Sequence, residues 1–265
     1  MMRGRPSMLR GAVGLLRGAV YVALALPPLI VVASSFSRTT FLTFPPRGFT
    51  LQWYGRAAQS RAFMDSLLLS TELAIAATGL ALLIGTPAAA AIVRRRFRGS
   101  EIVQALLLAP MVMPMVVLAI GLLQMMTWLG LAQTFVGLLI AHVVLTLPYV
   151  VRTMAASLSL FDRSLEEAAI SLRATPRQVV RRVMLPVLLP GVLSASVFCF
   201  VTSFGNITLS AFLARGGLVT LPVQIFTYVE HSYDPVLAAV STLVIVITLA
   251  VILLVERLAG LDRIV

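Results

Sequence analysis

The chain has 265 residues, of which 59% are hydrophobic and 12% charged, with a formal net charge of +11 and a mean hydropathy of +0.99. A soluble domain is about 45–50% apolar and about 25% charged, so this composition excludes an ordinary water-soluble domain and indicates a single domain embedded in lipid. The positive charge comes from 21 arginines without a lysine, mostly in short segments between apolar stretches, and we therefore expect no nucleic-acid partner.

Six stretches of the chain are long enough and apolar enough to span a membrane. A bilayer core about 30 Å thick requires a helix of about 20 residues. Because lipid offers no hydrogen-bond partner to the backbone, each stretch is predicted to be helical, and the predicted fold is an all-α, polytopic membrane protein. The predicted helices are residues 18–36, 66–93, 102–128, 133–151, 185–212 and 235–255.

The first stretch follows an arginine-bearing N-terminus, residues 1–17. Its charge order resembles that of a signal peptide, but the apolar part is too long and no small-residue cleavage site follows it, so we predict an uncleaved anchor. Pro110 and Pro114 lie inside the third stretch, where they are expected to kink the helix.

The arginines indicate how the helices are oriented. Sixteen of the 21 fall before the first helix, between the second and third, between the fourth and fifth, or after the sixth, whereas five fall in the other connections. The positive-inside rule therefore places residues 1–17, the loop of residues 152–184 and residues 258–265 in the cytoplasm.

The cytoplasmic loop carries two helix-start signals. Ser164 and Glu167 have the spacing of a capping box, and Thr175 with Gln178 repeats it, with Pro176 at the first helical position. The apolar side chains after the first start recur at the spacing of one helix face, namely Leu165, Ala168, Ala169 and Leu172. The loop is therefore predicted to be a helix, a break and a second helix.

Physical reasoning leaves two interpretations of this loop open. A face of small residues allows close docking in a groove of another protein. An amphipathic connector could equally rest on lipid headgroups.

The residue pattern of the loop resembles the EAA loop of ABC importer permeases. The resembling residues are Glu167-Ala168-Ala169, Ala174-Thr175-Pro176 and Met184-Leu185-Pro186. Outside the loop, Phe44-Pro45-Pro46 with Tyr54, and the segment Thr220–Ile225, are similar to the spermidine/putrescine-type permeases. This resemblance covers most of residues 20–257 and favours the docking interpretation.

The resemblance implies a type I ABC importer permease fold, with residues 18–257 as the transmembrane domain. In that family the loop couples the permease to a separate ATPase, and the matching residues here are Glu167, Ala168, Ala169, Arg173, Thr175, Pro176, Leu185 and Pro186. The family usually has Gly at the position of Arg173, where it permits a left-handed turn between the two helices. Arg adopts that conformation only at a cost of about 1 kcal/mol or more, which leaves the geometry of the turn open.

The resemblance also implies the partners: a dimer of ATPase subunits, a second homologous permease in a heterodimer, an extracytoplasmic substrate-binding protein and the lipid of the bacterial inner membrane. The chain is expected to be a transport subunit and not an enzyme, with no cofactor of its own. Its lack of lysine excludes the GK[ST] sequence of a P-loop. A polyamine such as spermidine or putrescine is the expected substrate, with iron, thiamine, phosphonate or a small amino acid as alternatives.

Four polar residues are candidates for the translocation path. Ser203, Asn206 and Ser210 fall on one face of the predicted fifth helix, where they could line the path or hydrogen-bond to a packed neighbour. Glu72 is the one acid well inside a predicted helix, and it could act on substrate or simply lie at the outer membrane interface. Related permeases often have an acidic residue close to Gly205, and this chain has none there.

An ion-coupled secondary transporter is the alternative from another functional class. Such a transporter requires ionisable groups within the membrane and often two related halves. Only Glu72 and His142 are candidates for such groups, and no internal repeat is evident, so the importer is favoured. Cys199 and the two histidines match no metal-ligand spacing, and packing or an interface is the expected role for each.

Overall fold

The structure is a computed structural model that describes residues 5–41, 43–94, 97–214 and 217–259. The chain is helical within these ranges, and none of the described residues lies in a strand, which confirms the all-α prediction. The outermost residues of both predicted termini, 1–4 and 260–265, lie outside the described part of the chain, as do Arg95 and Arg96.

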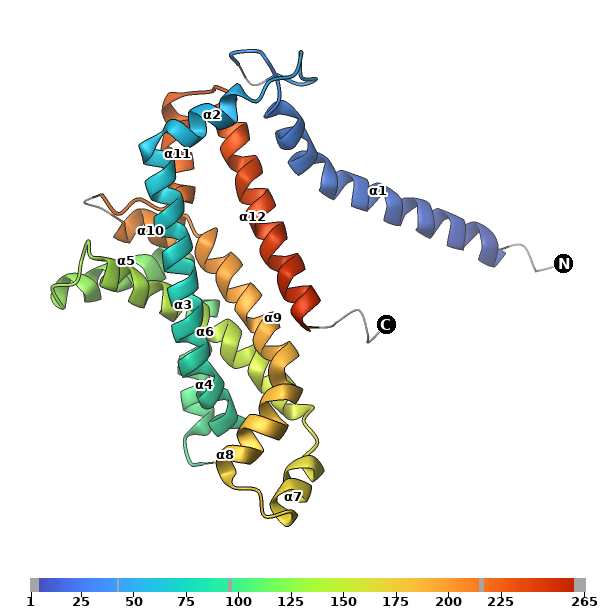
Figure 1. Cartoon of the computed structure of the whole chain (residues 1–265), viewed down its shortest axis with the longest axis vertical. Helices are drawn as coiled ribbons and strands as arrows, with labels where there is room; N and C mark the ends of the chain where they lie inside the picture. Colours follow the sequence, from blue (N-terminus) through green and yellow to red (C-terminus); the bar gives the residue numbers. More distant parts are fainter. Residues whose placement is uncertain (1–4, 42, 95–96, 215–216, 260–265) are drawn as a thin grey trace. The chain divides into compact units, whose positions relative to one another are not determined.

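Figure 1 shows the helices in chain order. They are α1 (Arg5–Ser34), α2 (Gln52–Gln59), α3 (Arg61–Arg94), α4 (Ser100–Val112), α5 (Met115–Trp128), α6 (Phe135–Ser159), α7 (Ser164–Ser171), α8 (Pro176–Val179), α9 (Leu185–Phe204), α10 (Thr208–Leu213), α11 (Leu221–His231) and α12 (Val236–Ala259). A π-helical turn, η1 (Val180–Met184), joins α8 to α9. In this described part of the chain, five helical segments are long and apolar enough to cross a membrane, and α4 with α5 would make a sixth.

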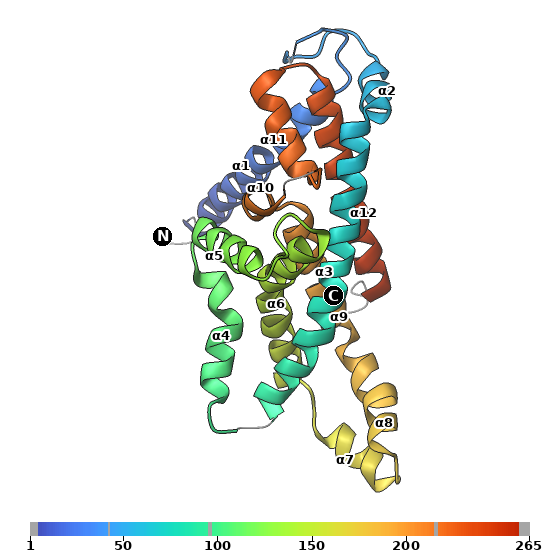
Figure 2. The ribbon, with the colours of Figure 1, turned by 90° about the vertical axis from the view of Figure 1, so that its left-hand side faces the viewer.

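The predicted third helix is broken in the middle. α4 and α5 are bent by 111° at Met113 and Pro114, and Figure 2 shows the sharp corner between them. Pro114 lacks an N–H group and forces the residue before it out of the helical region, and Met113 is accordingly extended with φ −73° and ψ 142°. The prediction of one helix over residues 102–128 is therefore wrong, while the expected kink is confirmed at Pro114 and not at Pro110, which stays inside α4.

The predicted fifth helix is wrong at both ends. Its N-terminal part begins at Pro176 and runs without interruption through η1, because the N–H of Leu185 bonds to the carbonyl of Val180 five residues earlier. One wide turn of this kind accommodates Pro186, which cannot donate the usual bond. At the other end α9 stops at Phe204, and a short separate helix, α10, begins at Thr208.

The chain forms two units, residues 1–64 with 225–247 and residues 65–224 with 248–265. In the second unit α6 is the central helix, and more than half of its apolar span is buried. One side of α6 packs with α3, α5 and α10 through Leu73, Leu122, Met126, Leu138 and Leu209. Further along, it packs with α3 and α9 through Ala81, Val151, Met154, Leu188 and Ala195.

Two glycines let helices of the second unit approach α6 closely. A Cβ atom at Gly191 of α9 would lie 2.8 Å from the Cβ of Ser157, and one at Gly85 of α3 would lie 2.8 Å from a methyl group of Val150. Small residues at helix contacts are typical of membrane proteins, because backbone approach replaces the hydrophobic effect as the source of attraction. At these two points the backbones of α3 and α9 lie close to side chains of the central helix.

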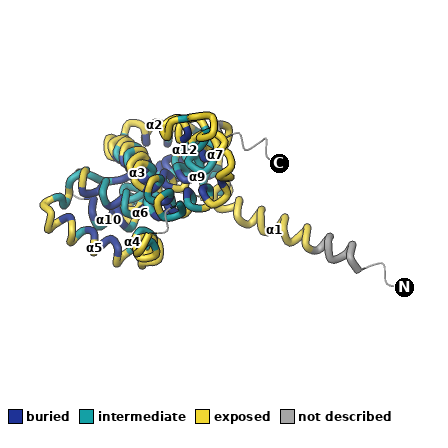
Figure 3. The backbone as a smooth tube through the Cα atoms, turned by 90° about the horizontal axis from the view of Figure 1, so that it is seen from below, coloured by how far each residue is buried: buried dark blue, intermediate teal, exposed yellow. Residues whose placement is uncertain are grey.

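In the first unit, the segment that links α1 to α2 folds back on itself. The indole N–H of Trp53 donates to the carbonyl of Ser37 at 2.7 Å, and the hydroxyls of Ser35 and Tyr54 are 2.7 Å apart. Every described side chain of α1 from Val13 to Leu29 is exposed, as Figure 3 shows in yellow. An apolar helix with no buried side chain over this length is compatible with a lipid environment and not with water.

Candidate functional site

Helix α7 of the loop between α6 and α9 is capped by a residue that the sequence did not suggest. The Asp162 carboxylate accepts a hydrogen bond of 2.9 Å from the backbone N–H of Ser164. This bond lowers the pKa of Asp162 below its usual value. Ser164 is already inside the helix and makes no cap with its side chain, so the predicted Ser164–Glu167 capping box is wrong. Asp162 satisfies the free amide in its place.

The end of α7 is a left-handed turn at Arg173. This residue has φ +58°, its N–H bonds to the carbonyl of Ile170 at 2.8 Å, and the N–H of Ala174 bonds to the carbonyl of Ala169 at 3.1 Å. This pair of bonds is the Schellman motif that usually places Gly at the left-handed position. Arg173 therefore adopts the conformation expected of the family's Gly, and the turn keeps its geometry despite the substitution.

The second helix of the loop starts as predicted. The Thr175 hydroxyl accepts from the N–H of Gln178, the Gln178 side chain accepts from the N–H of Thr175, and Pro176 occupies the first turn. Because α8 continues through η1 into α9, Leu185 and Pro186 lie within a continuous helix and not at its start. The second helix of the loop is thus continuous with the span that follows it.

The face of α7 that carries the predicted coupling residues is open. No side chain of α7 is buried, and the apolar side chains of Leu165, Ile170 and Leu172 are 43%, 57% and 85% exposed. Glu167 and Ala168 are exposed beside them, and Ala169 is half-buried. Such a surface, with small and apolar residues around one carboxylate, suits docking against another protein.

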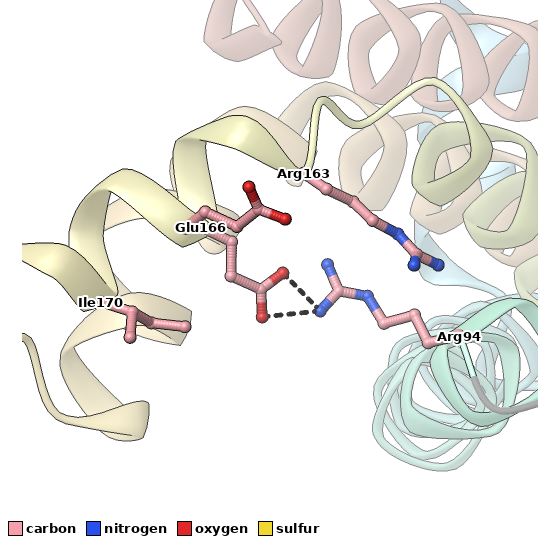
Figure 4. A pocket seen from close by; sticks show the side chains of 5 residues that line it. Arg94, Arg163, Glu166 and Ile170 are labelled. Atoms are coloured by element: carbon pink, nitrogen blue, oxygen red, sulfur yellow. Dashed lines mark hydrogen bonds and ion pairs between the residues drawn. The ribbon is translucent and has the colours of Figure 1, made fainter.

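One ion pair ties α7 to the end of α3. A terminal guanidinium nitrogen of Arg94 donates to both Glu166 carboxylate oxygens, at 2.9 and 3.1 Å. Its guanidinium carbon also lies 5.5 Å from the ring centre of Phe161. Figure 4 shows this pair among the residues that line a cavity of about 250 Å³, namely Arg94, Arg163, Glu166, Glu167 and Ile170. From the sequence, Arg94 was used only as a sign of orientation. Its contact with Glu166 was not predicted, because the two residues are 72 positions apart.

The predicted polar stripe is divided by the break between α9 and α10. Ser203 lies at the end of α9, Asn206 lies in the break and Ser210 lies in α10. Asn206 caps α10, since its side-chain oxygen accepts from the N–H of Leu209 at 2.8 Å. The prediction that the three residues share a face of one straight helix is therefore wrong, because Asn206 stabilises a new helix start.

Ser203 and Ser210 instead meet at a buried histidine. The Nδ1 atom of His142 lies 2.8 Å from the Ser203 hydroxyl, and its Nε2 atom lies 3.1 Å from the Ser210 hydroxyl. All three residues are at least 97% buried. A neutral imidazole has one donor and one acceptor, and each hydroxyl can serve as either. We call these three residues the histidine cluster; it joins α6, α9 and α10.

The remaining predicted residues lie apart from both groups. Glu72 is exposed on α3, on the same face as the exposed Leu68 and Ile75. Cys199 is fully buried and its thiol lies 3.5 Å from the carbonyl of Thr146, which confirms its predicted packing role.

Comparison with known proteins identifies a family and relatives that match most of the chain. Residues 78–261 match the family described as binding-protein-dependent transport system inner membrane component. The chain is 34% identical over 236 residues to the spermidine/putrescine transport system permease protein PotC of Haemophilus influenzae, covering 89% of this chain and 91% of that protein. It is 32% identical over 232 residues to the putrescine transport system permease protein PotI of Escherichia coli K12, covering 85% and 82%.

The fold also matches solved structures. A chain of the bacterial ABC transporter involved in the import of the acidic polysaccharide alginate has a TM-score of 0.76 and 19% identity, covering 97% of this chain and 99% of that one. At this identity the likeness establishes the fold alone.

Proposed function

Because this chain belongs to the family of binding-protein-dependent transport system inner membrane components, we propose that it forms part of the path along which an ATP-driven importer moves a polyamine into the cell. The chain is a permease subunit of an ABC importer in the inner membrane, a transport component and not an enzyme. The observation that supports a polyamine as the substrate is the 34% identity to a spermidine/putrescine permease over about nine-tenths of both chains.

The proposed complex contains ATPase subunits, a binding protein and a second permease in addition to this chain. The 265 residues include no lysine and hence no P-loop lysine, so ATP binding is assigned to a pair of ATPase subunits. Substrate is delivered by an extracytoplasmic binding protein, and a second, homologous permease completes the path as a heterodimer. The family description, a binding-protein-dependent transport system inner membrane component, supports the separate binding protein.

The open face of α7 is proposed to receive the motion of the ATPase. Glu167, Ala168 and Ala169 would seat in a groove of the ATPase, and the Schellman turn at Arg173 would hold α8 at a fixed angle to α7. Thr175 and Pro176 start the continuous helix that contains Leu185 and Pro186. A movement of the loop therefore reaches the membrane without crossing a flexible joint.

The candidate path residues are assigned different roles. The hydroxyls of Ser203 and Ser210 are engaged by His142 inside the protein, and Asn206 is engaged as a helix cap, so these three are proposed to hold the helices together. Glu72 is exposed on a membrane-spanning helix, where a carboxylate is costly unless it meets a cation or water. We assign Glu72 to the path, where it would attract an ammonium group of the substrate.

The coupling role is tested by replacing Ala168 and Ala169 together with Trp in the complete complex, reconstituted in proteoliposomes. Uptake of labelled spermidine and co-purification of the ATPase are expected to fall at least tenfold, because two indole rings prevent close docking. The matched control replaces the same two residues with Ser, which keeps the face small and is expected to retain more than half of the uptake. Normal uptake in the Trp variant would refute the coupling role.

The substrate is tested by competition. Unlabelled spermidine or putrescine should displace labelled spermidine, whereas iron, thiamine, a phosphonate or a small amino acid should not. Glu72→Gln is expected to raise the half-saturating spermidine concentration severalfold without changing ATPase co-purification. Uptake by the purified chain without any ATPase would instead identify an ion-coupled transporter.

A further inference from the structure

The ion pair between Arg94 and Glu166 connects two helices that lie far apart in the sequence. Arg94 is the last residue of α3, and Glu166 lies in the first turn of α7. Helix α7 itself packs against α8 and η1, which follow it in the same loop. Within the described ranges of the chain this is the one salt bridge.

Two features make this contact stronger than an ordinary surface pair. The side chains of Arg94 and Glu166 are only 23% and 27% exposed. The cation sits at the C-terminus of one helix and the anion at the N-terminus of another, so each charge is also stabilised by its own helix dipole. An exposed ion pair contributes little by itself, but partial burial and fixed geometry increase the contribution.

The arginine is held in place by the protein core. Its guanidinium lies over the ring of Phe161 at 5.5 Å, a distance at which a cation is attracted to an aromatic face. Phe161 is 7% exposed and belongs to the same buried cluster as Ala89 of α3 and Leu158 of α6. Arg94 is therefore fixed on one side by the core and on the other by α7, as Figure 4 shows for its contact with Glu166.

We propose that Arg94 and Glu166 form a brace that transmits movement of α7 to α3 during transport. The loop is covalently connected to α6 and to α9. The brace connects it to α3 as well, so that a movement of α7 would displace three membrane helices. This inference rests on the proposed function, in which α7 receives the motion of the ATPase. Both residues act as positioning residues, since neither is assigned a contact with substrate.

The coupling experiment measures spermidine uptake and ATP hydrolysis together in proteoliposomes that contain the complete complex. Arg94→Glu and Glu166→Arg are each expected to lower the spermidine taken up per ATP hydrolysed about tenfold, because each places two like charges together. The double variant R94E/E166R restores an opposite pair and should return this ratio to within threefold of the wild type. Arg98→Glu, a reversal of a nearby exposed arginine, is the matched control and should leave the ratio within twofold.

A second readout does not depend on transport. In the full-length chain in detergent, trypsin should cut after Arg163 and Arg173 about fivefold faster in Glu166→Gln than in the wild type, because α7 is released from α3. Glu166→Gln leaves every trypsin site intact.

The outcomes separate the brace from the proposed function. If both charge reversals keep their coupling ratio, or if the double variant is no better than the worse single variant, the brace is refuted while the importer stands. If the wild-type complex takes up no polyamine, the proposed function fails, and unchanged trypsin cleavage in Glu166→Gln would then refute the brace as well.

Discussion

The loop between α6 and α9 and the histidine cluster are both polar, but they differ in charge and in burial. The loop carries full charges, leaves α7 without a buried side chain and relies on one partly exposed ion pair. The histidine cluster carries neutral groups, is almost completely buried and satisfies both imidazole nitrogens. Where water is present, charges can separate and pair again at little cost, whereas in the membrane interior an unpaired polar group is expensive. The loop is thus suited to binding and movement, and the cluster is suited to holding three helices in place.

The largest effect is expected from removing the centre of the buried cluster. His142→Leu leaves the hydroxyls of Ser203 and Ser210 buried without partners, at about 1–3 kcal/mol for each. The melting temperature of the purified chain in detergent should fall by many degrees. The triple variant H142L/S203A/S210A removes the unpaired groups and should recover part of the loss. If His142→Leu melts like the wild type, the cluster does not hold the helices.

The next effect concerns the close contact between α9 and α6 at Gly191. Gly191→Ala places a methyl group 2.8 Å from the Cβ of Ser157, and such overpacking costs roughly 1–3 kcal/mol. The melting temperature should fall, and the added change Ser157→Gly should restore part of it by opening space. Ser157→Gly alone is the control. A double variant less stable than both single variants would contradict the steric explanation.

A gain of stability is expected at the left-handed turn of the loop. Arg173→Gly removes the strain of a side chain at φ +58°, which is worth about 1 kcal/mol. Hydrogen exchange of the backbone amides at positions 173 and 174 should slow severalfold. Arg173→Ala removes the guanidinium but keeps the strain, and it should exchange like the wild type. Equal protection in the Ala and Gly variants would show that the guanidinium and not the backbone matters.

The smallest effect is the pH dependence of the α7 cap. The hydrogen bond from Ser164 lowers the folded-state pKa of Asp162. The ionised carboxylate therefore stabilises α7 fully above the unfolded-state pKa of about 3.9. The stabilisation is lost as the pH falls through the lowered folded-state pKa. Amide exchange in the first turn of α7 should therefore increase below about pH 4, relative to Asp162→Asn. Asn accepts the same bond without titrating, so parallel pH profiles for the two proteins would exclude this cap.

Much of the fold follows from the sequence, because a stretch that is apolar enough to lie in lipid must be helical. The helix ends follow less well: α1 begins at Arg5 and not at residue 18, and α6 runs on to Ser159, past the predicted end at residue 151. Thr175 and Gln178 predicted the start of α8 correctly, since capping is a local interaction. The predictions failed where a distant partner or a proline decides the local structure. The bend at Pro114 is far larger than a proline kink, because α5 packs with α6 and α10 and not in line with α4.

The candidate site was also predicted only where its structure depends on local interactions. The residue pattern predicted a break between the two loop helices but left the geometry at Arg173 open. The structure shows a left-handed turn there, closed by two local backbone bonds. Arg94 and Glu166 are 72 residues apart, and His142 and Ser203 are 61 apart. No spacing rule connects such pairs, so both contacts became visible only in the folded chain.

The unbroken helix from Pro176 to Phe204 has a mechanical consequence, because it carries the loop at one end and Ser203 of the histidine cluster at the other. At 1.5 Å per residue its 29 residues span roughly 42 Å, and Gly191 lets it lie directly against α6 partway along this length. The helix therefore acts as a strut between the loop and the core. A force applied at the loop acts on an element whose other end is tied to His142.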